Sequence, residues 1–188
     1  MNPMALEHGR PADLRAPREM VAYDTLDRLH ISYRRVDHAP ADTMEACAAV
    51  DEILGGRMCK NLFLCNRQCT DFYLLLMPGD KPFRTKELSA QLNVSRLSFG
   101  SSEHMESLLG LSPGSVSVLG LINDTAHRVR LLIDKDLLTF PEIGCHPLVN
   151  TSSVAFSIED LLHTLLPSIG HSPTVVELSH GENEANAR

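Results

Sequence analysis

Two short apolar runs, close together in the sequence, constrain the fold of this chain most strongly. Residues 62–65 and 72–77 consist almost entirely of strand-forming apolar residues, and a polar stretch with Arg67 and Gln68 separates them. Strands this apolar normally lie inside a sheet that is covered on both faces. Lys60 stands at the head of the first run, so its ammonium group either reaches back to water or is held there to meet an anion.

The composition fits one domain with its own core. Of the 188 residues, 43% are hydrophobic and 22% are charged, and both fractions are ordinary for a globular domain. No apolar run approaches the roughly 18 residues of a membrane span, and the N-terminus lacks a signal-like apolar stretch, so we expect a cytoplasmic protein with no membrane partner. We predict a flexible arm at 1–15, a single domain at 16–179 and a disordered tail at 180–188.

Charge and cysteine content restrict the kind of site. The net charge of -7 argues against indiscriminate nucleic-acid binding, but it permits a site that holds only the end of a nucleic acid. The five cysteines are an odd number in a chain that is not a small secreted scaffold, so we expect free thiols. Their spacing lacks the second pair or regular histidines of a structural zinc site, so we predict no metal and no cofactor.

The order of the remaining elements favours an α+β fold. Helices are predicted at 17–30, 42–54, 85–92, 101–110 and 157–166, with a helical turn at 135–138. Further strands are predicted at 31–36, 115–122, 129–133, 154–156 and 174–178. Because strands and helices are interspersed without strict alternation, we expect a mixed, mostly antiparallel sheet with helices packed on it.

Three polar places interrupt the apolar structure. The first is Lys60 with Asn61. The second is the glycine-edged segment 114–120, which is either a strand with tight turns or backbone brought close to a ligand. The third is the segment 144–151 around His146, where a lone histidine is more often structural than catalytic.

Familiar catalytic patterns are missing from the sequence. It has no Rossmann, P-loop or nucleophile-elbow motif. No pair of catalytic carboxylates is evident, because Asp134 and Asp136 look like turn and cap residues. Cys145 and His146 are not expected to act as a catalytic pair, because adjacent strand residues point to opposite faces.

Six segments in order resemble the YbaK/ProX family of aminoacyl-tRNA deacylases, relatives of the editing domain inserted in bacterial prolyl-tRNA synthetases. These segments are 37–40 with Thr43, 60–64, 96–101, 109–117, 119–124 and 146–151. The forms of 60–64 and 146–151 resemble the ProX branch, which is associated with removing alanine mischarged onto proline tRNA. The YbaK branch is associated with cysteine. One departure is Val118, which stands where the family often carries proline.

The resemblance implies a fold, a reaction and a set of site residues. The fold is a mixed or barrel-like sheet with surrounding helices. The reaction is hydrolysis of the ester that joins an amino acid to the terminal ribose of tRNA(Pro), with prolyl-tRNA synthetase as a candidate partner. Lys60 would bind a terminal phosphate, Asn61 would orient that contact or the ester, and His146 would bond the substrate or order the water.

The same resemblance assigns substrate binding to a further set of residues. Thr43 would hold the substrate or the water at the mouth of the site. Backbone amides around the glycine-edged segments would bind the oxyanion. The residues in this set are Thr43, Gly114, Ser117, Gly120 and Gly144. Two alternatives remain, which are a Cys-tRNA(Pro) deacylase of the YbaK branch and a non-catalytic binder of aminoacyl-tRNA ends.

Overall fold

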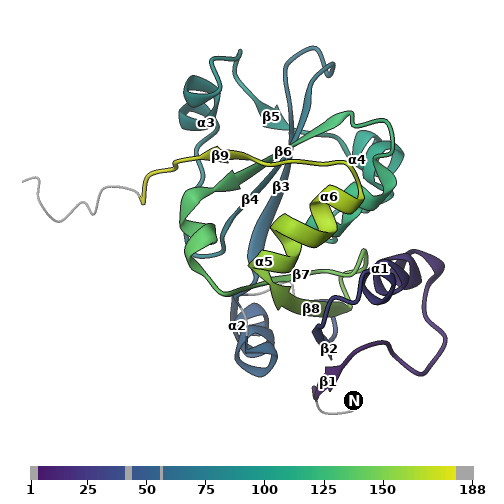
Figure 1. Cartoon of the computed structure of the whole chain (residues 1–188). Coiled ribbons are helices and arrows are strands. Elements are labelled where there is room, and N and C mark those ends of the chain that lie inside the picture. The colour runs from purple at the N-terminus through teal and green to yellow at the C-terminus, as the bar shows by residue number, and fades with distance from the viewer. Residues whose placement is uncertain (1–3, 41–43, 56, 181–188) are drawn as a thin grey trace, which may run out of the picture.

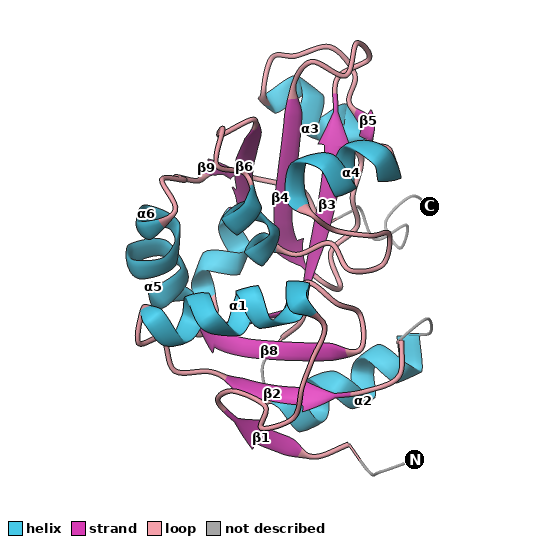
Figure 2. Cartoon of the chain, turned by 90° about the vertical axis from the view of Figure 1, so that its right-hand side faces the viewer, coloured by secondary structure: helices cyan, strands magenta, loops and turns pink. Residues whose placement is uncertain are grey.

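The computed structural model describes residues 4–40, 44–55 and 57–180, and its strands form two sheets that run crosswise to one another (Figure 2). The first sheet is antiparallel with the order β1-β2-β8-β7, and its strands are β1 Leu6–His8, β2 Arg34–Asp37, β7 Glu142–Cys145 and β8 Ser152–Ser157. The second has the order β5-β3-β4-β6-β9, and its strands are β3 Cys59–Cys65, β4 Phe72–Pro78, β5 Ser98–Phe99, β6 Val129–Asp134 and β9 Thr174–Val176.

Pairing in the second sheet is mixed. Strand β3 is antiparallel to both β4 and β5, whereas β6 lies parallel to β4 and β9. Together the two sheets confirm the predicted α+β fold with mostly antiparallel ladders. In the described part of the chain the sheets stay open and do not close into a barrel.

Helices cover the sheets and fill the space between them (Figure 1). The α-helices are α1 Pro17–Arg28, α2 Met44–Leu54, α3 Thr85–Gln91 and α4 Ser102–Leu109. One continuous C-terminal helix is made of α5 Ile158–Asp160, the π-turn η3 Leu161–Leu165 and α6 Leu166–Ser168. Two short 3₁₀ helices are η1 Val118–Asn123 and η2 Lys135–Thr139.

Capping explains where several of these helices begin and end. The Ser101 hydroxyl accepts the amide of His104 at the start of α4, and Gly110 ends that helix with a φ of 64°. The Ser157 hydroxyl accepts the amide of Asp160 at the start of the C-terminal helix. Of the two candidate caps Ser101 and Ser102, the structure thus uses Ser101, and Ser157 caps its helix as predicted, whereas the predicted cap Asp42 lies outside the described residues.

Buried side chains form three clusters in layers. The largest lies between the sheets and includes Phe63 from the second sheet, Phe156 from the first sheet and Leu26 from α1. A second cluster lies on the far face of the second sheet, where α3 contributes Leu88. The third lies on the far face of the first sheet, where α2 contributes Leu54. Because the second sheet is covered on both faces, the apolar runs of β3 and β4 lie inside it, as predicted.

Side chains of β3 alternate between two of these clusters. Phe63 and Cys65 point into the cluster between the sheets, whereas Leu64 points into the cluster under α3. By the same alternation, Asn61 faces the space between the sheets and Lys60 faces the other side. These adjacent polar residues therefore serve different surroundings.

One predicted strand is wrong. Residues 115–122 were expected to be extended, but η1 begins at Val118. Gly114 turns the chain with a φ of 86°, and the Ser117 hydroxyl then accepts the amide of Leu119 at 3.2 Å. Four consecutive buried residues follow, 118–121, and a short apolar run of this kind does not distinguish a strand from a buried helix.

Three strands were not predicted, and the shortest of them is the two-residue β5. Residues 6–8, within the predicted flexible arm, pair with β2 as β1. Residues 142–145 pair with β8 as β7. Both are only three or four residues long, and the glycine in β7 weakens its strand signal. The division of the chain into arm, domain and tail stays a prediction, and 181–188 lie outside the described residues.

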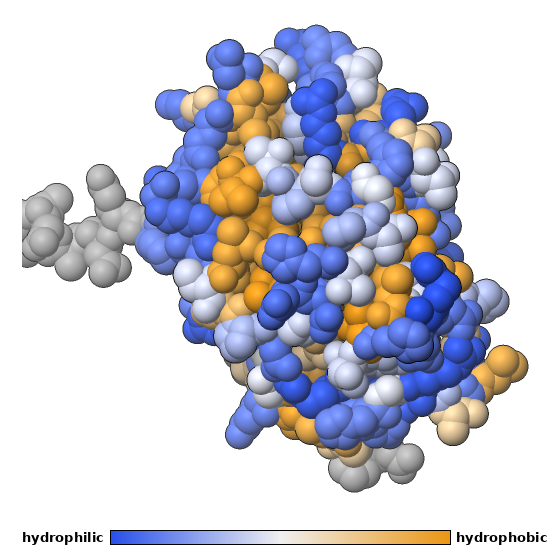
Figure 3. All heavy atoms as spheres, viewed as in Figure 1, coloured by the Kyte–Doolittle hydropathy of each residue, from blue (hydrophilic) through white to orange (hydrophobic). Residues whose placement is uncertain are grey.

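The surface of the described chain is mixed in character. Figure 3 shows apolar patches on one face that are interrupted by polar side chains. Within residues 4–40, 44–55 and 57–180, the model has no helix with the length and apolar character that a bilayer crossing requires.

Candidate functional site

A pocket of about 400 Å³ lies where the two sheets meet. The second sheet supplies Lys60 and Cys59 from the start of β3, the first sheet supplies Ser153 from β8, and His146 lies directly after the end of β7. The rest of the lining comes from His38, from α2, from the segment before β3 and from the turn after β4: His38, Ala48, Val50, Asp51, Arg57, Met58, Gly79 and Asp80. Lys60 and His146, which are 86 positions apart in the sequence (146 − 60), thus share one cavity.

The join between the sheets is a close backbone contact beside this pocket. Met58 and Gly144 form an isolated β-bridge, and the Gly144 amide donates to the carbonyl of Arg57 at 2.8 Å. A Cβ on residue 144 would lie 2.8 Å from Met58 Sδ and 3.2 Å from the Met58 Cα. Glycine is therefore needed at 144 to let the two sheets approach.

Lys60 is half-buried, and its ammonium group is already oriented by the protein. Its Nζ donates to the carbonyl oxygen of Lys81 at 2.7 Å. An ammonium group has three N–H donors, so this contact leaves two for a ligand. Lys60 thus lines the pocket and has an ammonium group that the protein holds, an arrangement that can bind an anion.

His146 lies in a short chain of polar contacts. Its Nδ1 lies 3.0 Å from the carbonyl oxygen of Ser152, which can only accept, so Nδ1 carries the hydrogen. The Nε2 of the neutral ring is then an acceptor, and it has no hydrogen-bond partner among the described residues. Ser153 Oγ lies 3.5 Å from the same Nδ1 and 2.9 Å from Nε2 of His38.

His38 is oriented in the same way. Its Nδ1 lies 2.7 Å from the carbonyl oxygen of Ala39, so Nδ1 is the donor and Nε2 accepts the hydroxyl hydrogen of Ser153. Ser153 is fully buried, so it links the two rings instead of acting as an exposed nucleophile. The rings of His38 and His146 lie 6.0 Å apart between their centroids.

Burial shifts the pKa of three groups that line the pocket, and one of them is the Cys59 thiol, whose pKa it raises. Burial lowers the pKa of His146 below 6.5, and nearby His38 lowers it further, while the Ser152 carbonyl acts in the opposite direction. His146 is therefore neutral at neutral pH. Burial also raises the pKa of Asp51, although its carboxylate accepts the amide of Met58 at 3.3 Å.

The amide group of Asn61 does not face this pocket. Its oxygen accepts the backbone amide of Val118 at 2.9 Å, and its nitrogen donates to the carbonyl of Cys59 at 3.0 Å. The proline that the family often carries at position 118 has no amide hydrogen and could not make the first of these bonds. Asn61 thus ties β3 to the start of η1, and its predicted contact with the substrate stays a prediction.

The backbone N–H groups of Gly120 and Gly144, which were expected to bind an oxyanion, already donate hydrogen bonds within the chain. The Gly120 amide donates to the carbonyl of Ser117 at 3.0 Å, and the Gly144 amide donates to Arg57. A Cβ on Gly120 would lie 2.6 Å from Leu111 Cδ1, so this glycine serves close packing. In the described conformation, therefore, the amides of Gly120 and Gly144 are not free donors for a substrate.

The remaining predicted site residues lie elsewhere. Gly114 is an exposed turn residue, Ser117 is buried in the core, and neither lines the pocket among the described residues. Thr43 lies outside the described residues. The structure therefore brings together Lys60 and His146 from the predicted set.

Sequence reasoning missed several lining residues. His38 and Ser153 were not singled out, although His38 belongs to a segment that resembles the family and Ser153 is a polar residue at the head of an apolar strand. Asp51 was hidden among the polar positions of α2. Its contact with Met58 depends on the approach of two segments that no local pattern predicts.

Comparisons with known proteins agree with this architecture. The model of the family described as the aminoacyl-tRNA editing domain matches residues 38–164. A solved structure described as a candidate trans-editing enzyme for prolyl tRNA synthetase superposes with a TM-score of 0.67 at 19% identity. It covers 89% of this chain and 100% of that chain, and at this identity it shows the fold alone.

Two curated relatives match over most of their length. The prolyl-tRNA editing protein ProX of Acetoanaerobium sticklandii is 30% identical over 166 residues, which are 88% of this chain and 99% of that protein. The prolyl-tRNA synthetase associated domain-containing protein 1 of Danio rerio is 29% identical over 168 residues, which are 88% of each.

Proposed function

Because the chain belongs to the family of aminoacyl-tRNA editing domains and is an aminoacyl-tRNA deacylase, we propose that it removes alanine from mischarged tRNA(Pro). The observation that carries the proposal is that Lys60 and His146 line the same pocket at the junction of the two sheets. The name of the ProX relative and the sequence form of residues 60–64 and 146–151 support proline tRNA as the carrier.

The pocket offers a partner for each charged part of an aminoacyl ester. Two N–H donors of Lys60 remain for a terminal phosphate of the tRNA. The carboxylate of Asp51 suits the α-ammonium group of the amino acid. Binding that ammonium group would also offset the burial that raises the pKa of Asp51.

His146 suits the handling of water. Its free Nε2 can accept a hydrogen from a water molecule as the water oxygen attacks the ester carbon. The bond from that carbon to the ribose oxygen then breaks, and the ribose oxygen takes up the proton from His146. Free amino acid and free tRNA result, with no covalent intermediate and no cofactor in the scheme.

The walls of the pocket favour a small amino acid. Ala48, Val50, Met58 and Cys59 supply its apolar lining, so methyl-sized side chains find apolar contacts there. Binding alone separates side chains that differ by one methylene by only about 1–3 kcal/mol. Sparing of Pro-tRNA(Pro) is therefore expected to come from steric exclusion of the proline ring.

A panel of charged tRNAs tests the proposal. Purified protein is incubated with Ala-tRNA(Pro), Cys-tRNA(Pro) and Pro-tRNA(Pro), and the release of each amino acid is followed. Alanine should be released fastest and proline should be spared. Preferential release of cysteine would support the YbaK-type alternative, and binding without any release would support a non-catalytic binder.

The Lys60→Ala variant tests the assigned anchor. Loss of a charge-assisted contact with a phosphate should lower kcat/KM by at least about tenfold. Lys135→Ala is the matched control, because Lys135 is an exposed lysine that pairs with Glu177 away from the pocket. Normal hydrolysis by Lys60→Ala would remove Lys60 from the mechanism.

A further inference from the structure

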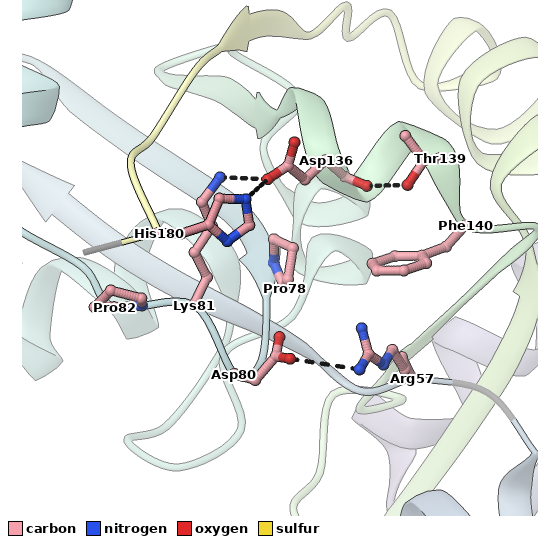
Figure 4. Close-up of a pocket in the computed structure, with 9 residues that line it drawn as sticks. All are labelled: Arg57, Pro78, Asp80, Lys81, Pro82, Asp136, Thr139, Phe140 and His180. Atoms are coloured by element: carbon pink, nitrogen blue, oxygen red, sulfur yellow. Dashed lines mark hydrogen bonds and ion pairs between the residues drawn. The ribbon is translucent and has the colours of Figure 1, made fainter. Parts of the chain in front are cut away.

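Lys81 is a buried lysine that the mechanism above does not use. Its side chain is only 1% exposed, and its Nζ lies 2.9 Å from Asp134 and 2.7 Å from Asp136. Asp134 is fully buried at the end of β6, and Asp136 lies in η2 and also contacts His180 at 2.8 Å (Figure 4). A lysine this deeply buried requires such partners, and two carboxylates supply them.

The two aspartates are themselves held in place. Asp134 caps η2 by accepting the amide of Asp136 at 3.0 Å, which fixes both carboxylates at the end of β6. Burial works against the charge of Lys81, but Asp136 and Asp134 outweigh it and raise the pKa of Lys81. The predicted turn and cap roles of these aspartates are therefore only part of what they do.

The backbone of Lys81 faces the candidate site. Its carbonyl oxygen accepts Nζ of Lys60 at 2.7 Å. Lys81 belongs to the turn after β4, where its amide donates to the carbonyl of Pro78 at 3.2 Å. A Cβ on Gly79 of the same turn would lie 2.8 Å from the carbonyl oxygen of Met58, so the turn packs directly against the pocket wall.

Lys81 thus takes part in two groups of contacts, one through its side chain and one through its carbonyl oxygen. The side chain of Lys81 fastens the turn to the end of β6, and its carbonyl orients the ammonium group of Lys60. Without the fastening, the turn would lose its side-chain tie to β6 and η2 and would keep the Lys81–Pro78 hydrogen bond, the packing of Gly79 on Met58 and the exposed ion pair of Asp80 with Arg57. The acceptor of Lys60 would then move with the turn.

We propose that Lys81, clamped by Asp134 and Asp136, is a positioning residue that fixes the ammonium group of Lys60 for the substrate phosphate. The inference rests on the proposed function for its consequence in catalysis. It assigns Lys81 no contact with the substrate, because its ammonium group is enclosed by the two carboxylates.

The test removes the clamp without leaving a buried charge. Lys81→Met alone would leave Asp134 buried without its partner, so the working variant is Lys81→Met with Asp134→Asn, which keeps an oxygen to cap η2. Asp136→Asn is a milder variant for use if the double variant does not fold, since Asp136 is 25% exposed. Lys135→Met is the control for the loss of an exposed ion pair.

Coupling to Lys60 is the decisive measurement. The double variant of Lys81→Met with Asp134→Asn, called the clamp-free variant below, should have a kcat/KM about tenfold lower than that of the wild type. Both are measured with an aminoacyl-tRNA that the wild type hydrolyses. In a Lys60→Ala background the same double substitution should lower kcat/KM by less than about twofold, because the ammonium group that Lys81 positions is absent. An equal factor in both backgrounds, or wild-type activity in the clamp-free variant, would overturn the proposal.

A second readout does not depend on turnover. Acetic anhydride labels lysines according to how free their amines are, and mass spectrometry compares Lys60 with Lys135 in the same sample. In the clamp-free variant, Lys60 should be labelled at least about threefold faster relative to Lys135. The net free energy of the lost hydrogen bond corresponds to roughly this factor or more. If the wild type released no amino acid, the proposed function would fail, and unchanged labelling would separately refute the positioning role.

Discussion

At the scale of single residues, Val118 departs from the family pattern and thereby provides a backbone N–H group for a hydrogen bond. Its buried amide donates to the side-chain oxygen of Asn61, and the side-chain nitrogen of Asn61 donates to the Cys59 carbonyl. This short chain of bonds orders the start of β3, directly before and after Lys60. A proline at 118 would remove the donor and leave Asn61 free to turn.

Val118→Pro is therefore expected to act mainly through Asn61. The backbone should accept proline, because Ser117 before it is extended, with φ −151° and ψ 149°, and position 118 opens η1. We expect the free energy of unfolding to fall by about 1 kcal/mol, which is the net contribution of one hydrogen bond. Urea unfolding measures this change.

A double-mutant cycle with Asn61→Ala separates the bond from other effects. In the Asn61→Ala background, Val118→Pro should change the free energy of unfolding very little, since the side-chain oxygen that accepts the amide of residue 118 is absent. Val118→Ala keeps the amide and serves as the control, so its effect should be the same in both backgrounds. Additive effects of Val118→Pro and Asn61→Ala would show that the bond contributes no stability.

His146 carries a pH dependence whose sign follows from burial. Its pKa in the folded protein is lower than 6.5, its ordinary value in the unfolded chain. Between those two values the unfolded state binds more protons, so the contribution of His146 to stability is complete above 6.5 and is lost as the pH falls through the folded pKa. Acid should thus destabilise the fold through this residue.

A matched variant isolates the histidine from other titrating groups. Asp51 and Glu19 have pKa values raised chiefly by burial and act in the opposite direction, so the wild type is compared with His146→Asn, which keeps a side-chain N–H donor. As the pH falls from about 7.5 to about 5.5, the wild type should lose more of its free energy of unfolding than the variant, measured by urea unfolding. Parallel pH profiles would contradict this.

At the scale of elements, the bridge between β7 and the segment before β3 determines the shape of the pocket. Gly144→Ala would press a Cβ against Met58 Sδ at 2.8 Å, with backbone atoms of Arg57 and Met58 at 3.2 Å. We expect a loss of about 1–3 kcal/mol in the free energy of unfolding and a larger fractional loss in deacylation, since the bridge adjoins both Lys60 and His146.

Met58→Ala provides the background that checks this steric explanation. Removing the sulfur relieves the shortest contact, so Gly144→Ala should cost less stability in that background than in the wild type. The backbone contacts at 3.2 Å remain, so part of the loss should persist. An identical loss in both backgrounds would mean that the side chain of Met58 is not the obstacle.

Local sequence patterns predicted helices and strands well where a single kind of interaction determines the element. The apolar runs gave β3 and β4, and serine caps gave the starts of α4 and the C-terminal helix. The alternation along β3 could also have shown that Lys60 and Asn61 point to opposite faces. The 3₁₀ helix η1 was missed because a run of buried residues has no period that favours either structure.

The candidate site was only partly predictable for a different reason. Lys60 and His146 carry a signal in their own segments, since each is polar within apolar surroundings. The bonds that orient them come from distant residues, including the carbonyl of Lys81 and the carbonyl of Ser152. Because carbonyl groups occur in every residue, no sequence pattern identifies those two as partners.

At the scale of the whole molecule, an acidic protein is matched to a polyanionic substrate. The chain has 24 acidic and 17 Lys and Arg residues, and this net charge disfavours a broad positive surface that would hold the length of a tRNA. We therefore expect binding to depend on few phosphates of the tRNA, and Lys60 is the proposed partner of one of them. The sensitivity of activity to salt should be correspondingly small.

The salt dependence of kcat/KM measures the number of phosphates directly. A plot against salt concentration on logarithmic axes should have a slope of about −2, whereas a protein that contacts many phosphates shows about −6 or steeper. Lys60→Ala should reduce the steepness by about 1, and Lys135→Ala should leave it unchanged. A slope as steep as that of a repressor would mean that a basic surface elsewhere holds the tRNA.

The hydrogen bond from the Gly144 amide to the Arg57 carbonyl has a consequence for hydrogen exchange. It is a backbone bond between the two sheets, so deuterium can reach that amide only when the sheets separate there. Its exchange rate therefore reports the free energy of opening the junction in the native protein. The same opening would part Lys60 from His146, so the protection of this one amide is a measure of how often the pocket ceases to exist.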